Sequence, residues 1–489
     1  QQRSYYIVDT LQIYILITII FVFFLAREWT KPAYQTELED GFDALLANLK
    51  KAERNLTSPI AMAPPLEERR LQEGYKYLLG HLVRITGSDF NNNPETPRFE
   101  RAITFLSKWT GDNADNAYLQ APIDGNFAYR VTGRVPYYRG NNAKTLRDIP
   151  QAPGLVLFQT GTNMVGDTGS LKEFKTCRNQ TLGFIDNYSL QIEPDGSFEI
   201  LLSPEKPDNY EGNWLATKAM LPCKNDNDEA ESKERVAKFL VIRETFFNWS
   251  QEHPLDLDIV RIGFEGIPPS HVTTAERAEQ MRSLGEKTAN QIEFWNWLMQ
   301  IGLEAWGDRD FDGEARLPVN DVNPPEPPFV AGGMAGAKLL YASGMFALEK
   351  DEALILEIEN PTKPDYIGFH LGDAWMQSTD QANYVSSRNH SQMEAAENNS
   401  TYLVVAHKDP GVSNWVDTTG LLNGQMVFRF WYADEPSADK FPQVNVRKVN
   451  FDNIREELAY KNPTMVTQSQ RRLEVAERQK HIRMRYREY

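Results

Sequence analysis

One pattern occurs twice in this chain, and a repeat on that scale limits the folds that the chain can adopt. The first copy is DGSFEILLSPEKP followed by GNWLAT, and the second is NNSTYLVVAHKDP followed by SNWVDT. Each copy has an apolar run, a proline-containing turn, and an Asn-Trp pair that leads through an aliphatic residue to the final threonine. The copies lie about 200 residues apart, which indicates two related folding units.

Further segments align at separations near 200 residues, with insertions between them. The stretch NAYLQAPIDGNFAYRVTGRV aligns with KLLYASGMFALEKDEALILEIEN, and FLVIRETF, which contains Arg243, aligns with MVFRFWYA, which contains Arg429. The period-two alternation of these stretches is typical of strands. The sequence therefore predicts a mainly β protein with helical additions. We expect residues 113–265 and 338–450 to form two related antiparallel units of the sandwich or jelly-roll type.

We interpret the Asn-Trp turn as a structural device in both units. A tryptophan side chain is large enough to fill the end of a sandwich, and an asparagine amide satisfies backbone polar groups in loops. A binding role for the turn is the alternative interpretation.

Helical patterns surround the β units. Residues 37–54 and 66–86 place apolar side chains at three- and four-residue spacing, as amphipathic helices do. The stretch TPRFERAITFLSKWTG predicts a third helix, closed by Gly111. We expect these helices to form a collar over residues 28–112.

A long amphipathic helix is predicted from Thr274 to Trp306, where Thr273 and Glu276 have the spacing of a capping box. After the first β unit we expect a long connecting helix over residues 266–310 and a connector rich in Pro and Gly over residues 311–337. After the second β unit we expect a basic C-terminal helix or tail over residues 451–489.

The beginning of the chain predicts a membrane anchor over residues 5–27. No charged residue occurs between Leu11 and Ala26, and Tyr6 and Trp29 flank the apolar run as interfacial aromatics do. A cleaved signal peptide is the alternative, although no small-x-small cleavage site follows the run. We expect a single-pass protein of the bacterial inner membrane with its body on the periplasmic side.

Composition excludes one class of partner and raises the question of a disulfide bond. The formal net charge of −16 over 489 residues argues against nucleic acid as a partner, because phosphate is repelled. Cys177 and Cys223 are the two cysteines, which form either one disulfide in an oxidising compartment or two unrelated thiols.

Three stretches, DPGVSNWVDTTG, DEALILEIENP and FHLGDAWMQSTD, resemble a bacterial family catalogued as domain of unknown function twelve-fourteen. The likeness extends over most of the body. It implies a jelly-roll-like β fold in envelope or metabolic proteins, and it brings no reaction with it. Members often place His after the Asp-Thr-x-Gly turn, where this chain has Leu421.

Polar and aromatic residues gather in the second β unit as candidates for a ligand pocket. They are His370, Asp373, Trp375, His407, Asp409, Asn414, Trp415, Asp417 and Arg429. Histidines 370, 390 and 407 with a carboxylate have the chemistry of a metal site, yet no H-x-H cluster occurs, and hydrogen bonding within loops is the alternative.

An acidic stretch, WGDRDFDGEARLPVND, matches the first half of a calcium loop. Asp308, Asp310 and Asp312 alternate before Gly313, but the twelfth position is Val319, where an EF-hand has a bidentate Glu. Calcium is the cofactor that this pattern favours, and an acidic, solvated turn is the alternative.

The functional expectation has two forms. The first is a membrane-anchored extracytoplasmic accessory or structural subunit, with the lipid bilayer and either other membrane-protein subunits or further copies of the chain as partners. The second is an enzyme or small-ligand-binding protein that uses a pocket in the second β unit. The basic C-terminal segment is expected to dock on the chain's own acidic surface, on anionic lipid or on a partner.

Overall fold

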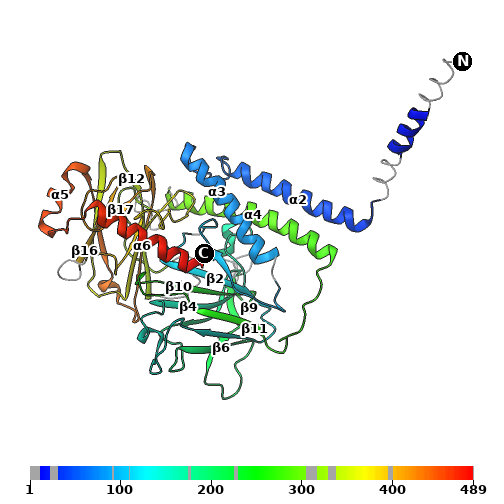
Figure 1. The fold of residues 1–489 in the computed structure, drawn as a ribbon, viewed down its shortest axis with the longest axis horizontal. Coiled ribbons are helices and arrows are strands. Elements are labelled where there is room, and N and C mark those ends of the chain that lie inside the picture. Colours follow the sequence, from blue (N-terminus) through cyan, green and yellow to red (C-terminus); the bar gives the residue numbers. More distant parts are fainter. Residues whose placement is uncertain are drawn as a thin grey trace, which may run out of the picture.

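The computed structural model describes residues 12–22, 31–90, 93–109, 111–174, 178–224, 230–303, 317–328, 338–394 and 400–487. In these parts the chain is mainly β, with several antiparallel sheets and a group of long helices beside them (Figure 1). The predicted fold class is confirmed at this level.

The first half of the body contains two sheets that share one core. The five-stranded sheet has the order β1 (Glu100–Ile103), β2 (Asn116–Pro122), β10 (Phe239–Thr245), β4 (Leu155–Gly161) and β5 (Thr181–Asp186). The four-stranded sheet has the order β11 (Asp256–Arg261), β3 (Tyr129–Arg134), β6 (Ser197–Ser203) and β7 (Asn213–Ala216). A separate hairpin joins β8 (Lys218–Lys224) to β9 (Ala230–Val236). Apolar side chains of both sheets, such as Phe158 and Ile200, meet between them.

The second half repeats this arrangement. One sheet has the order β12 (Leu339–Ala347), β18 (Asn423–Trp431), β14 (Tyr366–Gly372) and β15 (Ser387–Asn389). The other has the order β17 (Trp415–Asp417), β16 (Ser400–Ala406), β13 (Glu352–Glu359) and β19 (Gln443–Asn450). Phe428 and Leu403 belong to the core that these two sheets share.

The strand orders of the two halves match strand for strand. Without β1 and the β8–β9 hairpin, the eight strands β2 to β11 take the same places, in chain order, as β12 to β19. The match extends to direction, because β6 pairs with β7 in parallel and β16 pairs with β17 in parallel. Trp214 is opposite Leu201 and Trp415 is opposite Val404, so the two tryptophans also take equivalent places.

The two asparagines of the repeated turn make the predicted bonds. Asn213 accepts from the backbone N–H of Gln191 at 2.8 Å and donates to its carbonyl at 2.8 Å. Asn414 accepts from Glu394 N–H at 2.7 Å and donates to its carbonyl at 3.0 Å. Each amide therefore fixes the loop before the strand beside it, as the structural interpretation of the turn requires.

Three long helices lie together beside the sheets (Figure 1). They are α2 (Ala33–Asn55), α3 (Glu68–Ile85) and α4 (Thr274–Leu303). Helices α2 and α4 approach closely, because a Cβ on Gly285 would lie 2.9 Å from the Cα of Leu45. The capping box at the start of α4 is present, since Thr273 N–H donates to Glu276 at 2.7 Å and Glu276 N–H to Thr273 at 3.2 Å. The predicted end of this helix lies outside the described residues.

One predicted helix is wrong. Within TPRFERAITFLSKWTG, residues Glu100–Ile103 form strand β1, and Arg101 pairs with Leu119 of β2. The indole N–H of Trp109 then donates to the carbonyl of Ala102 at 3.1 Å. The sequence pattern of so short an apolar segment does not distinguish a helix from a strand. Pairing with strand β2 makes this segment a strand.

Residues 12–22 are helical and their side chains are exposed. In the part of the chain that the structure describes, no helix combines the length and the apolar character that a membrane crossing needs. The predicted span covers residues 5–27, and its other residues, 5–11 and 23–27, lie outside the described residues.

The C-terminal helix α6 (Gln468–Tyr486) packs on the body of the same chain (Figure 1). Near its start, Arg471 forms an ion pair with Asp409 at 3.0 Å. Near its end, Arg485 donates to the carbonyl of Ala114 at 2.6 Å. The helix therefore contacts both halves of the protein.

Shorter turns complete the fold. They are a π-helical turn η1 (Thr86–Phe90), the 3-10 turns η2 (Leu146–Asp148), η3 (Leu171–Phe174), η7 (Ala438–Lys440), η8 (Phe451–Asn453) and η9 (Ala459–Lys461), and the short helix α5 (Ile454–Glu457).

Candidate functional site

A cavity of about 650 Å³ lies between the two halves of the body. Strands β2, β10 and β4 of the first half line one side of it, and β12 and β18 of the second half line the other. Helix α4 and residues 317–328 form another part of the cavity wall. Its volume falls in the range of small-molecule sites, about 300–1,000 Å³.

Strand alternation decides which side chains reach this cavity. On β10, Leu240 and Ile242 point into the core of the first half, whereas Val241 and Arg243 line the cavity. On β18, Phe428 faces the core of the second half, and the residues next to it line the cavity. The five-stranded sheet and the β12–β18–β14–β15 sheet therefore each have a second buried face.

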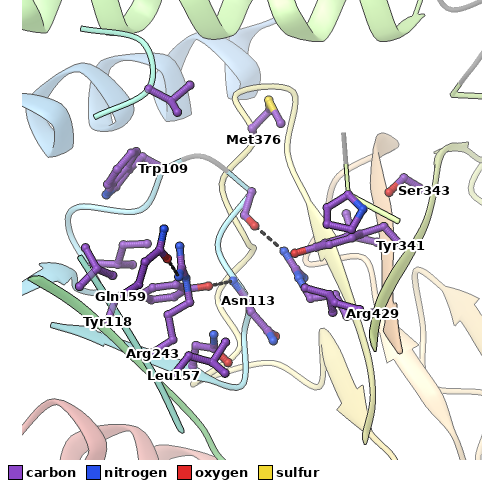
Figure 2. Close-up of a pocket in the computed structure, with 18 of the residues that line it drawn as sticks. Trp109, Asn113, Tyr118, Leu157, Gln159, Arg243, Tyr341, Ser343, Met376 and Arg429 are labelled. Carbon is purple, nitrogen blue, oxygen red and sulfur yellow. Dashed lines mark hydrogen bonds between the residues drawn. The ribbon is translucent and has the colours of Figure 1, made fainter. Parts of the chain in front are cut away.

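Arg243 and Arg429 occupy equivalent positions on these facing strands. Arg243 is opposite Tyr118 on the neighbouring strand β2, and Arg429 is opposite Tyr341 on the neighbouring strand β12. All four residues line the cavity. In Figure 2, Arg243 and Tyr118 come from one side and Arg429 and Tyr341 from the other, with Asn113 between them.

Arg243 and Arg429 each donate to a neutral acceptor. Arg243 donates to the side-chain oxygen of Gln159 at 2.7 Å, and burial lowers its pKa. Arg429 donates to Nδ1 of His370 at 3.0 Å and to the carbonyl of Gly111. Burial, and then the charge of Arg429, keep the pKa of His370 well below its usual value, so its ring is neutral and can accept this bond.

Buried hydrogen bonds fix the neighbouring side chains. The hydroxyl of Tyr118 accepts from Asn113 N–H at 2.8 Å. Tyr366 donates to Asp115 at 2.7 Å and accepts from the Asn113 amide at 3.0 Å. Burial raises the pKa of Tyr118 and, together with the Asp115 carboxylate, that of Tyr366, so both phenols stay protonated at neutral pH.

The cavity lining combines positive charge with apolar surface. Among the described residues that line it, Arg243 and Arg429 are the cations and Glu326 is the carboxylate. The apolar part of the lining includes Leu155, Leu157, Val241, Leu298, Met299, Val427 and Trp431. This arrangement suits an organic anion with an apolar body.

The structure separates the residues that the sequence grouped as pocket candidates. Arg429 lines the cavity, and His370 lies directly behind it. Asp373 is buried and accepts from the backbone of Trp375 at 2.9 Å and of Gln377 at 3.1 Å. Burial raises the pKa of Asp373 to about 7. Trp375 donates to the carbonyl of Arg70 at 2.7 Å, so it joins the second half to helix α3.

The other candidates make contacts within and beside the repeated turn. His407 bonds to Thr418 at 2.7 Å, and Asp417 accepts from Thr419 N–H at 2.8 Å. Trp415 donates to the carbonyl of Ala406 at 3.1 Å. Asp409 pairs with Arg471, and Asn414 holds the loop at Glu394, as described above. None of these five residues is among the described residues that line the cavity.

Two further predictions lie largely outside the described residues. Asp308, Asp310 and Asp312 are not described, so the calcium loop stays a prediction. In the described parts of the chain, no three His, Cys, Asp or Glu side chains are grouped as a metal ion would need. Cys223 is buried, and Cys177 lies outside the described residues, so their pairing also stays a prediction.

Sequence reasoning missed Arg243, Tyr118, Tyr341 and Gln159 as site residues. The sequence contained a signal for Arg243, because the alignment of the two repeats already matched Arg243 with Arg429. A charged residue at the same place in two buried strands is unusual unless both serve one site.

Comparisons with known proteins support the fold and leave the reaction open. Residues 172–222 match a family described as Protein of unknown function (DUF1214), which confirms the resemblance noted in the sequence. No curated protein matches the chain.

Two solved structures are similar to the chain. The first is the crystal structure of an uncharacterised protein from Burkholderia cenocepacia, with 23% identity and a TM-score of 0.65 over 86% of this chain and 99% of that one. At this identity the likeness shows the fold alone. The second is a protein from Vibrio parahaemolyticus, with 11% identity and a TM-score of 0.39 over 82% of this chain and 100% of that one. That score is too low to support an inference.

Proposed function

We propose that this protein binds a small organic anion with an apolar body in the cavity between its two halves. The observation that carries the proposal is the placement of Arg243 and Arg429 at equivalent positions of facing strands, each beside a tyrosine. This cavity lies between the two halves, whereas the sequence led us to expect a pocket within the second β unit.

Charge explains the choice of an anion. Among the described residues, Arg429 has no carboxylate partner, and its hydrogen bonds go to a neutral ring and a carbonyl. It is 7% exposed, so water screens its charge poorly. A carboxylate accepts two parallel N–H bonds from a guanidinium, and a hydrogen bond to a charged group contributes about 1.5–3 kcal/mol.

The apolar lining explains the rest of the ligand. Burying carbon surface against Leu157, Val427 and Trp431 stabilises a complex by roughly 25 cal/mol per Å². The two arginines come from opposite sides of the cavity, which fits either one anionic group between them or a ligand with an anion at each end.

Calorimetric titration of the full chain tests the proposal. The probes are monocarboxylates from butanoate to decanoate, the dicarboxylates of the same lengths, and the neutral amides of each. We expect the acids to bind, and we expect Arg243→Gln and Arg429→Gln each to weaken binding by roughly 10–100-fold. Arg134→Gln serves as the control, because its side chain is 71% exposed and lies outside the cavity lining. Equal affinity for acids and amides would count decisively against the proposal.

We also propose that the two halves are related β units of the sandwich or jelly-roll type that arose by duplication. The matching strand orders and the matching bonds of Asn213 and Asn414 support this origin. Interchanging the loops 204–212 and 407–413 between the halves should give a folded protein. A chain that fails to fold after this exchange would argue against equivalence of the two turns.

A second proposal concerns attachment of the protein to a membrane. We propose that the leading apolar segment attaches the body to the bacterial inner membrane, on the periplasmic side, where it acts as an accessory subunit of a membrane complex. The support is the exposed apolar surface of residues 12–22, which include Ile13, Ile17 and Phe21. Membrane fractionation of the full chain and of a variant without residues 1–30 tests the attachment. Recovery of both in the soluble fraction would exclude it, and a lone monomer in native mass spectrometry would exclude the complex.

A further inference from the structure

The cavity between the two halves has two ends of different character. On β18, Arg429 lies two residues before Trp431 and four residues after Gln425, and all three line the cavity. A strand advances about 3.3 Å per residue, so Arg429 is roughly 7 Å along the strand from Trp431 and roughly 13 Å from Gln425. These two limits are called the Trp431 end and the Gln425 end.

The Trp431 end is closed and apolar. Leu155 and Leu157 of β4 pack there with Trp431 and with Tyr366 of β14, so the walls of the two halves meet. The exposed fraction of each of these four side chains is 6% or less. This end therefore suits a short apolar group.

The Gln425 end is polar and lies beside helix α4. The amide nitrogen of Gln425 donates to the sulfur of Met299 of α4 at 2.8 Å. Ser343 of β12 and Gln180, which precedes β5, also belong to the lining. Neither the hydroxyl of Ser343 nor the side-chain amide of Gln180 makes a hydrogen bond among the described residues, and both are accessible to water. These groups are available to a ligand.

The available polar groups restrict the body of the ligand. An alkyl chain that covered them would leave each group without water and without a partner, which weakens binding by roughly 5–100-fold per group. A secondary amide has a carbonyl that accepts and an N–H that donates, so it can bond to a hydroxyl and to a carboxamide at once. The Gln425 end therefore favours an amide over a plain hydrocarbon.

Arg429 and Tyr341 supply donors for the anionic group, between the two ends. A guanidinium has five N–H donors, and two of those of Arg429 go to His370 and Gly111. Tyr341 is opposite Arg429, and its ring centroid lies 5.2 Å from the guanidinium carbon. The hydroxyl of Tyr341 donates to no acceptor among the described residues. Figure 2 shows Tyr341 and Ser343 on the same side of the cavity as Arg429.

We propose that the ligand is an N-acylated α-amino acid with an apolar side chain, either free or as the last residue of a short peptide. One carbon of such a molecule carries the carboxylate, the apolar side chain and the amide, which matches the order of the three parts of the cavity. The carboxylate lies at Arg429 and Tyr341, and the side chain points to the Trp431 end. The amide bonds to Ser343 and Gln180. This inference rests on the anion site proposed above and specifies its ligand.

The distance to the Gln425 end limits the length of the ligand. An extended peptide advances about 3.3–3.6 Å per residue, so roughly 13 Å holds about four residues. The cavity volume of about 650 Å³ is within the range of sites for molecules of this size. A free acyl amino acid fills the part nearest to Arg429, and a tetrapeptide reaches α4.

Calorimetric titration of the unchanged chain with matched ligands tests the inference. N-acetyl-leucine has the complete pattern, 2-isobutylpentanoate replaces its amide by two methylene groups, and N-acetyl-leucinamide lacks the carboxylate. We expect N-acetyl-leucine to bind at least about tenfold more tightly than either of the other two. N-acetyl-aspartate should bind more weakly than N-acetyl-leucine, because its side chain brings a charge to the apolar end.

A peptide distinguishes the two sources of the ligand. Tighter binding of Ala-Ala-Leu than of N-acetyl-leucine identifies the end of a peptide as the natural ligand. Equal or weaker binding of Ala-Ala-Leu identifies the free acyl amino acid.

Three variants report on the individual contacts. Ser343→Ala and Gln180→Leu should each weaken the binding of N-acetyl-leucine by about 3–10-fold, and should leave unchanged or strengthen that of 2-isobutylpentanoate. Tyr341→Phe should weaken the binding of both acids, because its hydroxyl meets the carboxylate. Tyr384→Phe is the control, since its side chain is 44% exposed and lies outside the cavity lining.

Equal affinity for N-acetyl-leucine and 2-isobutylpentanoate would overturn this inference and leave the anion site intact. Failure of both acids to bind would overturn the anion site and this inference with it. An equal loss of affinity for both acids in Ser343→Ala and in Gln180→Leu would also overturn the inference. The comparison of ligands uses the unchanged chain, so it stays decisive if a variant fails to fold.

Discussion

Asn213 and Asn414 make the same pair of bonds in the two halves of the protein, each with the N–H and the carbonyl of one loop residue. Asn213 also donates to the carbonyl of Glu199 at 2.8 Å. The two amides thus perform one structural role twice, and the role is open to direct measurement.

Asn213→Ala should lower the free energy of unfolding by about 1–3 kcal/mol, because the Gln191 N–H and two carbonyls lose their partner in a part-buried place. Urea denaturation measures the change. Asn209→Gly is the matched control, since Asn209 is exposed with φ of 57° and glycine tolerates that conformation. Equal stability of the two variants would show that the amide of Asn213 is dispensable.

The tryptophans beside these asparagines should differ in importance. Trp415 is 6% exposed and packs in a core cluster, so Trp415→Ala should cost about 3–5 kcal/mol. Trp214 is only half-buried, and Trp214→Ala should cost about half as much. Thermal unfolding compares the two. A melting temperature of Trp415→Ala equal to that of the unchanged chain, with ligand binding lost, would favour the binding role over the structural one.

Helix α6 should stabilise the body through its buried arginines. Arg478 is 2% exposed and donates to the carbonyl of Ser387 and, at 3.1 Å, to its hydroxyl. Arg478→Met leaves these acceptors without a partner and should lower the unfolding free energy by about 2–4 kcal/mol. Arg472→Met, on the exposed side of the same helix, should change it by less than about 0.5 kcal/mol. Similar effects in both variants would mean that the helix acts through its overall charge.

Glu244 should make stability depend on pH. Burial raises its pKa from 4.5 to about 7, against the opposing effects of the Leu255 N–H bond and of Arg101. The folded state therefore binds the proton more tightly than the unfolded state, and stability falls as pH rises from about 4.5 through about 7. Glu244→Gln does not titrate, so it should remove about 2–4 kcal/mol of this dependence.

Urea denaturation at a series of pH values between 4.5 and 7 measures the effect of Glu244→Gln. The exposed Glu359 of β13 provides the control, and Glu359→Gln should keep the pH dependence of the unchanged chain. An unaltered profile in Glu244→Gln would show that this carboxyl titrates at its ordinary value.

The contact of α2 with α4 should tolerate no side chain at position 285. Gly285→Ala places a Cβ 2.9 Å from the Cα of Leu45, which should cost about 1–3 kcal/mol even though alanine favours helices. Glu286→Ala, at an exposed neighbouring position, is the control. Greater stability of Gly285→Ala by thermal unfolding would mean that the two helices separate at little cost.

Local signals in the sequence predicted much of the fold. The alternation of FLVIRETF and MVFRFWYA identified two strands, and Thr273 with Glu276 identified the start of a helix. These features depend on neighbours a few residues away, so the sequence displays them directly. The repeated turn also predicted the bonds of Asn213 and Asn414.

The same kind of reasoning failed where contacts between residues far apart in the sequence determine the local structure. The stretch around Arg101 has helical spacing but pairs with β2 as a strand. Asp373 and His407 share polar surroundings in the sequence, yet the fold uses them in separate places.

By itself, the sequence determined which side chains share a face of each strand, because alternation along a strand is a property of the backbone. Only the tertiary structure decided that the face of β10 with Arg243 lies opposite the face of β18 with Arg429. The physical reason is that a second buried face needs another apolar surface to cover it. Contacts such as those among Leu157, Tyr366 and Trp431 supply that surface from residues far apart in the chain.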